Sequence, residues 1–138
     1  MLKKTVEKLE ARFASEIVKK LREKPVIIKE VTLLAGQIEA GSADILKSIA
    51  YQIRNSSDNT ILVAGAEIDG KAHIVAMVCD SLVKEKMLNA VLVIREIAGE
   101  IDGGGGGQPF LATAGGKKPS GIPEALKKAE EYLKKIIG

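Results

Sequence analysis

The residues best suited to a chemical role lie in one glycine-rich stretch, residues 102–118. It holds five consecutive glycines, Gly103 to Gly107, and a second pair, Gly115 and Gly116, directly before Lys117 and Lys118. Glycine lets bare backbone approach another group closely, and successive N–H groups in such turns can bind a phosphate. A flexible linker is the alternative. Because apolar residues and a second helical pattern follow, we expect an ordered connection between two helices, with anion binding assisted by the lysines.

Two known phosphate-binding motifs do not fit this stretch. No Gly-Lys-Ser/Thr closes the run as in a P-loop, and no helix begins directly after the five glycines. A dinucleotide-binding fingerprint follows a strand, whereas this run follows a predicted helix. Any anion binding here would therefore recognise a phosphate by shape and charge rather than base identity.

Groups suited to catalysis are scarce elsewhere. The single histidine, His73, lies inside an apolar run, and we interpret it as a structural or surface residue rather than a base or ligand. The single cysteine, Cys79, ends a predicted strand without a histidine nearby, so we expect a small buried side chain. The aspartates show no ligand-like spacing. We predict no catalytic site, no metal and no cofactor in this chain.

Composition limits the class of protein. The chain has 138 residues, of which 46% are hydrophobic and 28% charged, as expected for one globular domain with a real core. Aromatic residues make up 3%, so few side chains are available for stacking on nucleic-acid bases. No membrane span or signal peptide is evident, and we expect a cytoplasmic setting. The net charge of +3 is concentrated at the two ends of the chain, and a basic end can serve phosphate binding or form a solvated helix face.

The first 24 residues predict a long amphipathic helix that Pro25 ends. We expect its narrow apolar stripe to pack either on the chain's own sheet or on another helix, as in a homodimer. We therefore divide the chain into a helical segment, 1–24, and a globular α/β nucleic-acid-binding domain, 25–138. The stripe consists of Leu2, Val6, Leu9, Phe13, Ile17 and Leu21.

The rest of the chain predicts a single sheet with flanking helices. Strands are expected at 26–34, 60–64 and 72–78, the last two joined by a hairpin turn at Asp69-Gly70. Both of these strands are nearly all apolar, which indicates a central position in the sheet. Helices are expected after Ser42, after Asp80 or Ser81, over 90–101, and from about Pro123 to Ile136.

The stretch IAGEIDGGGGGQPFLATAGGKKP, residues 97–119, resembles the C-terminal, DHH-associated domain of alanyl-tRNA synthetases. The family's loop typically reads GGGGGRPDMAQGGG before a helix, and the likeness covers about residues 25–137. It implies a non-catalytic module that binds the outer corner of alanine-specific tRNA and helps aminoacylation and editing act on one tRNA. ATP and zinc are implied only for the longer parent enzyme, whose other domains would be partners. A module of a DHH-type phosphoesterase and a purely dimerising domain are the alternatives.

The resemblance assigns a role to the glycine motif, but this sequence departs from the family within it. Gln108 stands where the family has an arginine, and Phe110 and Leu111 replace Asp-Met. Losing the arginine removes a bidentate phosphate donor. We therefore expect nucleic-acid contacts from other basic residues as well. The candidates are Lys117, Lys118, Arg54, Lys71, Lys84, Lys86 and Gln108, together with the motif residues Gly103, Gly104, Gly105, Gly106, Gly107, Pro109, Gly115 and Gly116.

Overall fold

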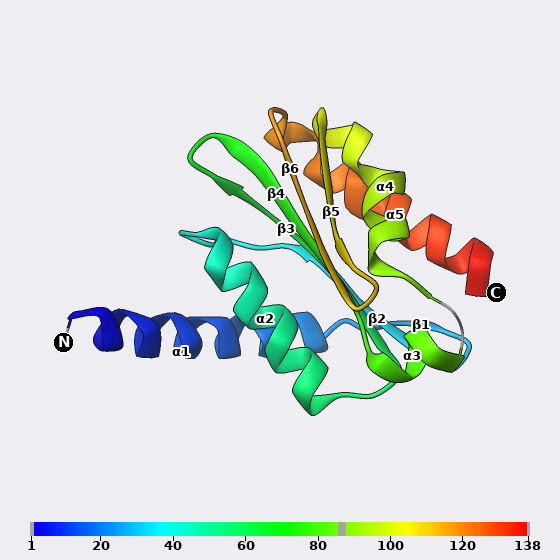
Figure 1. The fold of residues 1–138 in the computed structure, drawn as a ribbon, viewed down its shortest axis with the longest axis horizontal. Helices are drawn as coiled ribbons and strands as arrows, with labels where there is room; N and C mark the ends of the chain where they lie inside the picture. The colour runs from blue at the N-terminus through cyan, green and yellow to red at the C-terminus, as the bar shows by residue number, and fades with distance from the viewer. Residues whose placement is uncertain (1, 86–87, 138) are drawn as a thin grey trace.

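A mixed six-stranded sheet with helices on both faces forms the described part of the chain (Figure 1). The computed structural model describes the backbone of residues 2–85 and 88–137, and side chains from residue 12 onward in those ranges. The strands are β1 (Val26–Ile28), β2 (Val31–Gln37), β3 (Thr60–Ile68), β4 (Lys71–Val78), β5 (Gly103–Gln108) and β6 (Leu111–Gly116), in the order β1-β2-β3-β4-β6-β5. The helices are α1 (Leu2–Arg22), α2 (Ala43–Ser56), α3 (Asp80–Glu85), α4 (Ala90–Ile97) and α5 (Ile122–Ile137), with 3-10 turns at Ala98–Ile101 and Pro119–Gly121. The predicted α/β sheet domain is confirmed.

The sheet, with β3 and β4 at its centre, separates the core into two layers, one on each face. Alternate residues of β3 point to opposite faces of the sheet. Ile61 and Val63 pack with α4 and α5, whereas Leu62 and Ala64 pack with α1 and α2. The predicted turn at Asp69-Gly70 is present, and both residues have a positive φ. The central position expected for these strands is confirmed.

Two boundaries differ from the sequence-based expectation. The strand expected over 26–34 is two antiparallel strands, because Lys29 takes a positive φ and, with Glu30, forms a turn. The helix expected over 90–101 ends at Ile97 and continues as a 3-10 turn. Ser42 lies at the N-cap of α2 without a side-chain capping bond, whereas Asn89 caps α4 by accepting a hydrogen bond from the Val91 N–H at 2.8 Å.

The glycine stretch is an ordered connection between α4 and α5, as expected, but it takes the form of a β-hairpin that the sequence did not predict. The five glycines form most of the edge strand β5, which pairs antiparallel with β6. Glycine lowers the propensity for strand, so the sequence pattern does not indicate one. The backbones lie very close: a Cβ at Gly103 or Gly105 would overlap the carbonyl oxygen of Gly115 or Thr113. The run is extended, with a positive φ at Gly107 only, so it does not form a concave phosphate nest.

Helix α1 packs on its own domain in its C-terminal part. Ala14, Ile17 and Val18 are buried with α2, and Arg22 donates hydrogen bonds to the Ser56 and Ser57 hydroxyls at 2.7 Å. Phe13 is 42% exposed. The side chains of Leu2, Val6 and Leu9 lie outside the described residues. No helix among the described residues is long and apolar enough to cross a membrane.

The close approach of β5 to β6 predicts different effects at neighbouring glycines. Gly105→Ala should lower the free energy of unfolding by about 1–3 kcal/mol, because the added methyl overlaps the backbone of Thr113 and Ala114. Gly104→Ala is the matched control, since nothing lies within 4 Å of its added Cβ. Its effect should stay within about 0.5 kcal/mol. Urea unfolding measures both; equal losses would contradict the requirement for glycine at alternate positions.

Candidate nucleic-acid interface

The predicted basic contacts lie at two ends of the sheet. At one end, Lys71 begins β4 beside Lys117, because Ala72 pairs with Gly116 in the antiparallel register. Lys118 follows, and its backbone N–H donates to the Ile101 carbonyl at 3.0 Å. All three lysine side chains are exposed. These three exposed lysines lie at the same end of the sheet, which we call the lysine end.

The second group lies at the opposite end, near the turn between β5 and β6. The Arg54 guanidinium pairs with the Asp80 carboxylate at 3.2 Å and lies 4.0 Å from the centre of the Phe110 ring. Arg54 thus links α2, α3 and the hairpin, so part of its charge already has a structural role. Gln108 and Lys84 are exposed at this end. Lys86 lies outside the described residues.

Backbone hydrogen bonds fix the hairpin turn. The Ala90 N–H donates to the Pro109 carbonyl at 2.8 Å, and the Val78 N–H donates to the Phe110 carbonyl at 2.9 Å. The Phe110 ring is thereby held under Arg54, where a cation–π contact of this kind contributes about 0.5–1 kcal/mol when exposed. Phe110 is one of the departures from the family motif, and neighbouring residues in the sequence do not indicate its contact with Arg54.

The groups considered for catalysis do not assemble into a site. Cys79 is 2% exposed, its thiol donates to the Ser57 carbonyl at 3.2 Å, and burial raises its pKa. His73 is half-buried on β4. Within residues 12–85 and 88–137, no three His, Cys, Asp or Glu side chains are grouped to hold a metal ion. The structural interpretation of Cys79 as a buried side chain is confirmed.

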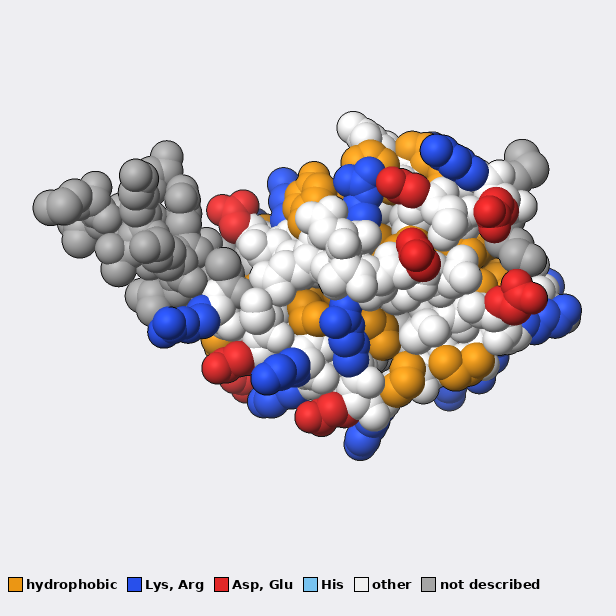
Figure 2. Space-filling view, turned by 90° about the horizontal axis from the view of Figure 1, so that it is seen from below, with side chains coloured by type: hydrophobic (Ala, Val, Ile, Leu, Met, Phe, Trp, Pro, Cys, Tyr) orange, Lys and Arg blue, Asp and Glu red, His pale blue; other side chains and the backbone are white. Residues whose placement is uncertain are grey.

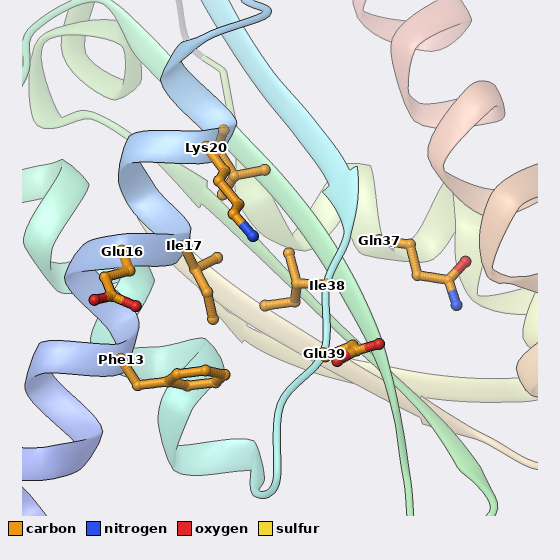
Figure 3. A pocket seen from close by; sticks show the side chains of 8 residues that line it. Phe13, Glu16, Ile17, Lys20, Gln37, Ile38 and Glu39 are labelled. Atoms are coloured by element: carbon orange, nitrogen blue, oxygen red, sulfur yellow. The ribbon is translucent and has the colours of Figure 1, made fainter.

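Several hollows mark the surface. One of about 410 Å³ lies between α1 and the end of β2, where Phe13 and Ile17 reach toward Ile38 (Figure 3). Two more lie between α2 and the hairpin; Lys47 lines both of them, and Tyr51 lines one. Figure 2 shows acidic and basic side chains interspersed on the face seen from below, without a large patch of one sign.

Sequence reasoning missed Lys47 and Tyr51 as candidates. Their spacing places them on one face of α2, together with Arg54 three residues further on. That spacing was available in the sequence. However, it does not show that this face of α2 lies beside the glycine hairpin, because the hairpin itself was not predicted.

Comparisons with known proteins identify relatives over nearly the whole chain. Residues 23–135 match the DHHA1 domain family. Alanine–tRNA ligases from Cytophaga hutchinsonii and Christiangramia forsetii are 35% and 41% identical over 133 residues. In both, the match covers 96% of this chain but 15% of the ligase.

Solved structures agree with this likeness. The C-Ala domain from Aquifex aeolicus alanyl-tRNA synthetase is 31% identical with a TM-score of 0.70, and the match covers 83% of this chain and 97% of that chain. A DHH-domain member of the s1p family of ribosomal proteins shares the fold alone, at 13% identity and a TM-score of 0.57, over 92% of this chain and 31% of its own.

The buried thiol predicts slow alkylation. The thiolate is the reactive form, and burial disfavours it, so iodoacetamide should modify Cys79 at pH 8 several-fold more slowly than a free cysteine. Because the folded state favours the neutral thiol, this contribution to stability is present below the ordinary thiol pKa and is lost as the pH rises through the raised value. Mass spectrometry with and without urea measures the rate; equal rates would show that the thiol is accessible.

Proposed function

We propose, since the chain belongs to the DHHA1 domain family, that it serves as a non-catalytic tRNA-binding module of an alanine–tRNA ligase. The observation that carries the proposal is the likeness to the Aquifex C-Ala domain, which covers nearly all of that domain. The domain would bind the outer corner of alanine-specific tRNA. It would thereby help the aminoacylation and editing parts of a longer enzyme act on one tRNA.

The surface chemistry supports binding to phosphates. Lys71 and Lys117 lie on adjacent strands, and Lys118 follows directly, so three ammonium groups can contact a nucleic-acid backbone together. None of the three forms an ion pair with another described residue. Phosphate contacts of this kind position a protein on RNA without reading its bases.

Activity of the whole enzyme would come from other domains. The chain spans about 15% of the length of the curated relatives it matches. We assign the ATP and zinc chemistry of the parent enzyme to those domains and none to this chain. A DHH-type phosphoesterase module remains a weaker alternative, because the DHH-domain likeness shows the fold alone.

Removing the lysine end should weaken tRNA binding. In a tRNA titration at several salt concentrations, the unaltered chain should lose affinity steeply as salt rises. Lys117→Ala with Lys118→Ala should weaken binding at low salt. The slope of log K against log salt should fall by about 1 for each phosphate that the altered chain no longer neutralises.

Lys135→Ala provides the control, because Lys135 is exposed in the last turn of α5, and the end of α5 lies beside Lys29 and Glu30 rather than beside the lysine end. It should leave the affinity and the slope unchanged. Absence of tRNA binding by the unaltered chain at low salt would reject the proposed function. If Lys117→Ala with Lys118→Ala weakens tRNA binding no more than the control substitution does, the lysine end is not the contact.

A second role, dimerisation through α1, is favoured by one observation. The α1 groove, defined by Phe13, Ile17, Leu21 and Ile38, leaves the Phe13 ring 42% exposed beside the buried part of the helix (Figure 3). An exposed aromatic ring in a partly apolar groove is a typical interface anchor. We propose that a second copy of α1 covers it, which is compatible with tRNA binding.

Replacing the ring tests the dimer. Sedimentation of the unaltered chain should show a concentration-dependent dimer, and Phe13→Asp should weaken it at least about tenfold, because a charge cannot be buried without a partner. Phe13→Leu, which keeps an apolar side chain, should retain most of the affinity. A monomer at every concentration, or a dimer unaffected by Phe13→Asp, would exclude this interface.

A further inference from the structure

We infer that a groove between α2 and the β5–β6 hairpin binds an unpaired base of RNA. We call it the Tyr51 groove and define it by Lys47, Tyr51, Gly106, Phe110 and Thr113. The inference rests on the proposed function and adds the RNA feature that is recognised, an unpaired nucleotide. The lysine end, by contrast, requires only a phosphate backbone.

The fold creates this groove because α2 covers only part of its face of the sheet. The buried residues of α2 pack on β3 and β4 in the core layer that they share with α1. The hairpin extends the sheet beyond that layer, and two hollows of about 200 and 180 Å³ lie between α2 and the hairpin. Both are lined by Lys47 and Thr113, so they adjoin. They are smaller than typical sites for drug-sized ligands, which suits one flat base.

The electrostatic character of the groove selects an anion. No carboxylate lines either of its two hollows, and Lys47, an exposed ammonium group, lines both. Three other hollows differ, since each includes at least one glutamate: Glu16 in the α1 groove, Glu30 beside β2, and Glu96 beside α5. A phosphate in the Tyr51 groove would therefore meet the Lys47 ammonium and no carboxylate in the lining.

The groove also holds an available stacking surface. The whole chain has only two tyrosines and two phenylalanines, and two of these four residues, Tyr51 and Phe110, line this one site. Tyr51 is 43% exposed, whereas Arg54 covers Phe110. Base stacking on such rings tolerates any sequence, because every base has a flat face.

Bare backbone forms the opposite wall. In the β5–β6 register Gly106 pairs with Thr113, and both line the hollow beside Tyr51. Nothing lies within 4 Å of a Cβ added at Gly106, so folding does not require glycine there. The missing side chain leaves room for a ligand instead. A base seated on Tyr51 would approach this backbone, and its phosphate would lie within reach of the Lys47 ammonium.

Tyrosine fluorescence can detect stacking directly. The chain lacks tryptophan, so the conservative variant Tyr132→Phe leaves Tyr51 as the only strong emitter. Addition of a short unstructured RNA oligonucleotide should quench this emission. In Tyr51→Phe, where Tyr132 alone remains, the emission should not change. Quenching in both variants or in neither would contradict stacking on Tyr51.

Substitutions separate this groove from the lysine end. Tyr51→Ala should weaken binding of the same oligonucleotide at least about fivefold, whereas Tyr51→Phe should retain it. Lys47→Ala should lower the salt slope by about 1. Gly106→Val should block the groove and weaken binding without lowering the melting temperature, because its Cβ meets nothing within 4 Å and valine favours a strand. Lys135→Ala serves again as the lysine control.

The two proposals fail in different ways. If the unaltered chain does not bind tRNA at low salt, the proposed function is wrong. If it binds tRNA, but Tyr51→Ala and Gly106→Val leave oligonucleotide and tRNA affinity unchanged, only the groove is wrong. If Gly106→Val loses binding and also has a lower melting temperature, its loss of binding does not test the groove. The comparison of Tyr51→Ala with Tyr51→Phe, at equal melting temperature, then tests whether the groove binds a base.

Discussion

The close approach of the bare backbones of β5 and β6 is the constraint on which the rest of the site depends. A Cβ at Gly103, Gly105 or Gly107 would overlap β6, and one at Gly116 would overlap the Ile101 carbonyl. The sheet can end in this hairpin only if those side chains are missing. The entropy lost in ordering five glycines is offset by ladder hydrogen bonds and by the anchored turn at Pro109 and Phe110.

This constraint accounts for alternate glycines but not for all of them. Gly104 and Gly106 alternate with the tightly packed positions, and a Cβ on either would meet nothing within 4 Å. One strand thus carries glycines needed for packing and glycines that packing does not require. Gly106, of the second kind, lines the proposed groove beside α2, where the approach of a ligand would explain bare backbone. If the proposed groove binds RNA, fold and recognition use the same residue type for separate physical reasons.

The sequence was informative where hydrophobic patterns and turn chemistry agree. The central strands, their turn at Asp69-Gly70 and the covering helices follow from apolar runs and positive-φ residues. The glycine hairpin could not be predicted, because its strand character comes from pairing with β6 rather than from its own propensity. The contact of Arg54 with Phe110 joins residues 56 positions apart, and local patterns do not indicate such pairs.

The positions of the cations suggest why a glutamine is tolerated at Gln108. The family motif has an arginine on the strand, whereas here Arg54 reaches the same turn from α2 and lies on Phe110. Lys47 and Tyr51 continue this helical face along the hairpin. Positive charge near the glycine strand is thus supplied by a rigid helix instead of the exposed edge. A helix holds its side chains at fixed spacing. A ligand on this side would therefore meet the Tyr51 ring, the Lys47 ammonium group and the bare backbone of the hairpin in one groove.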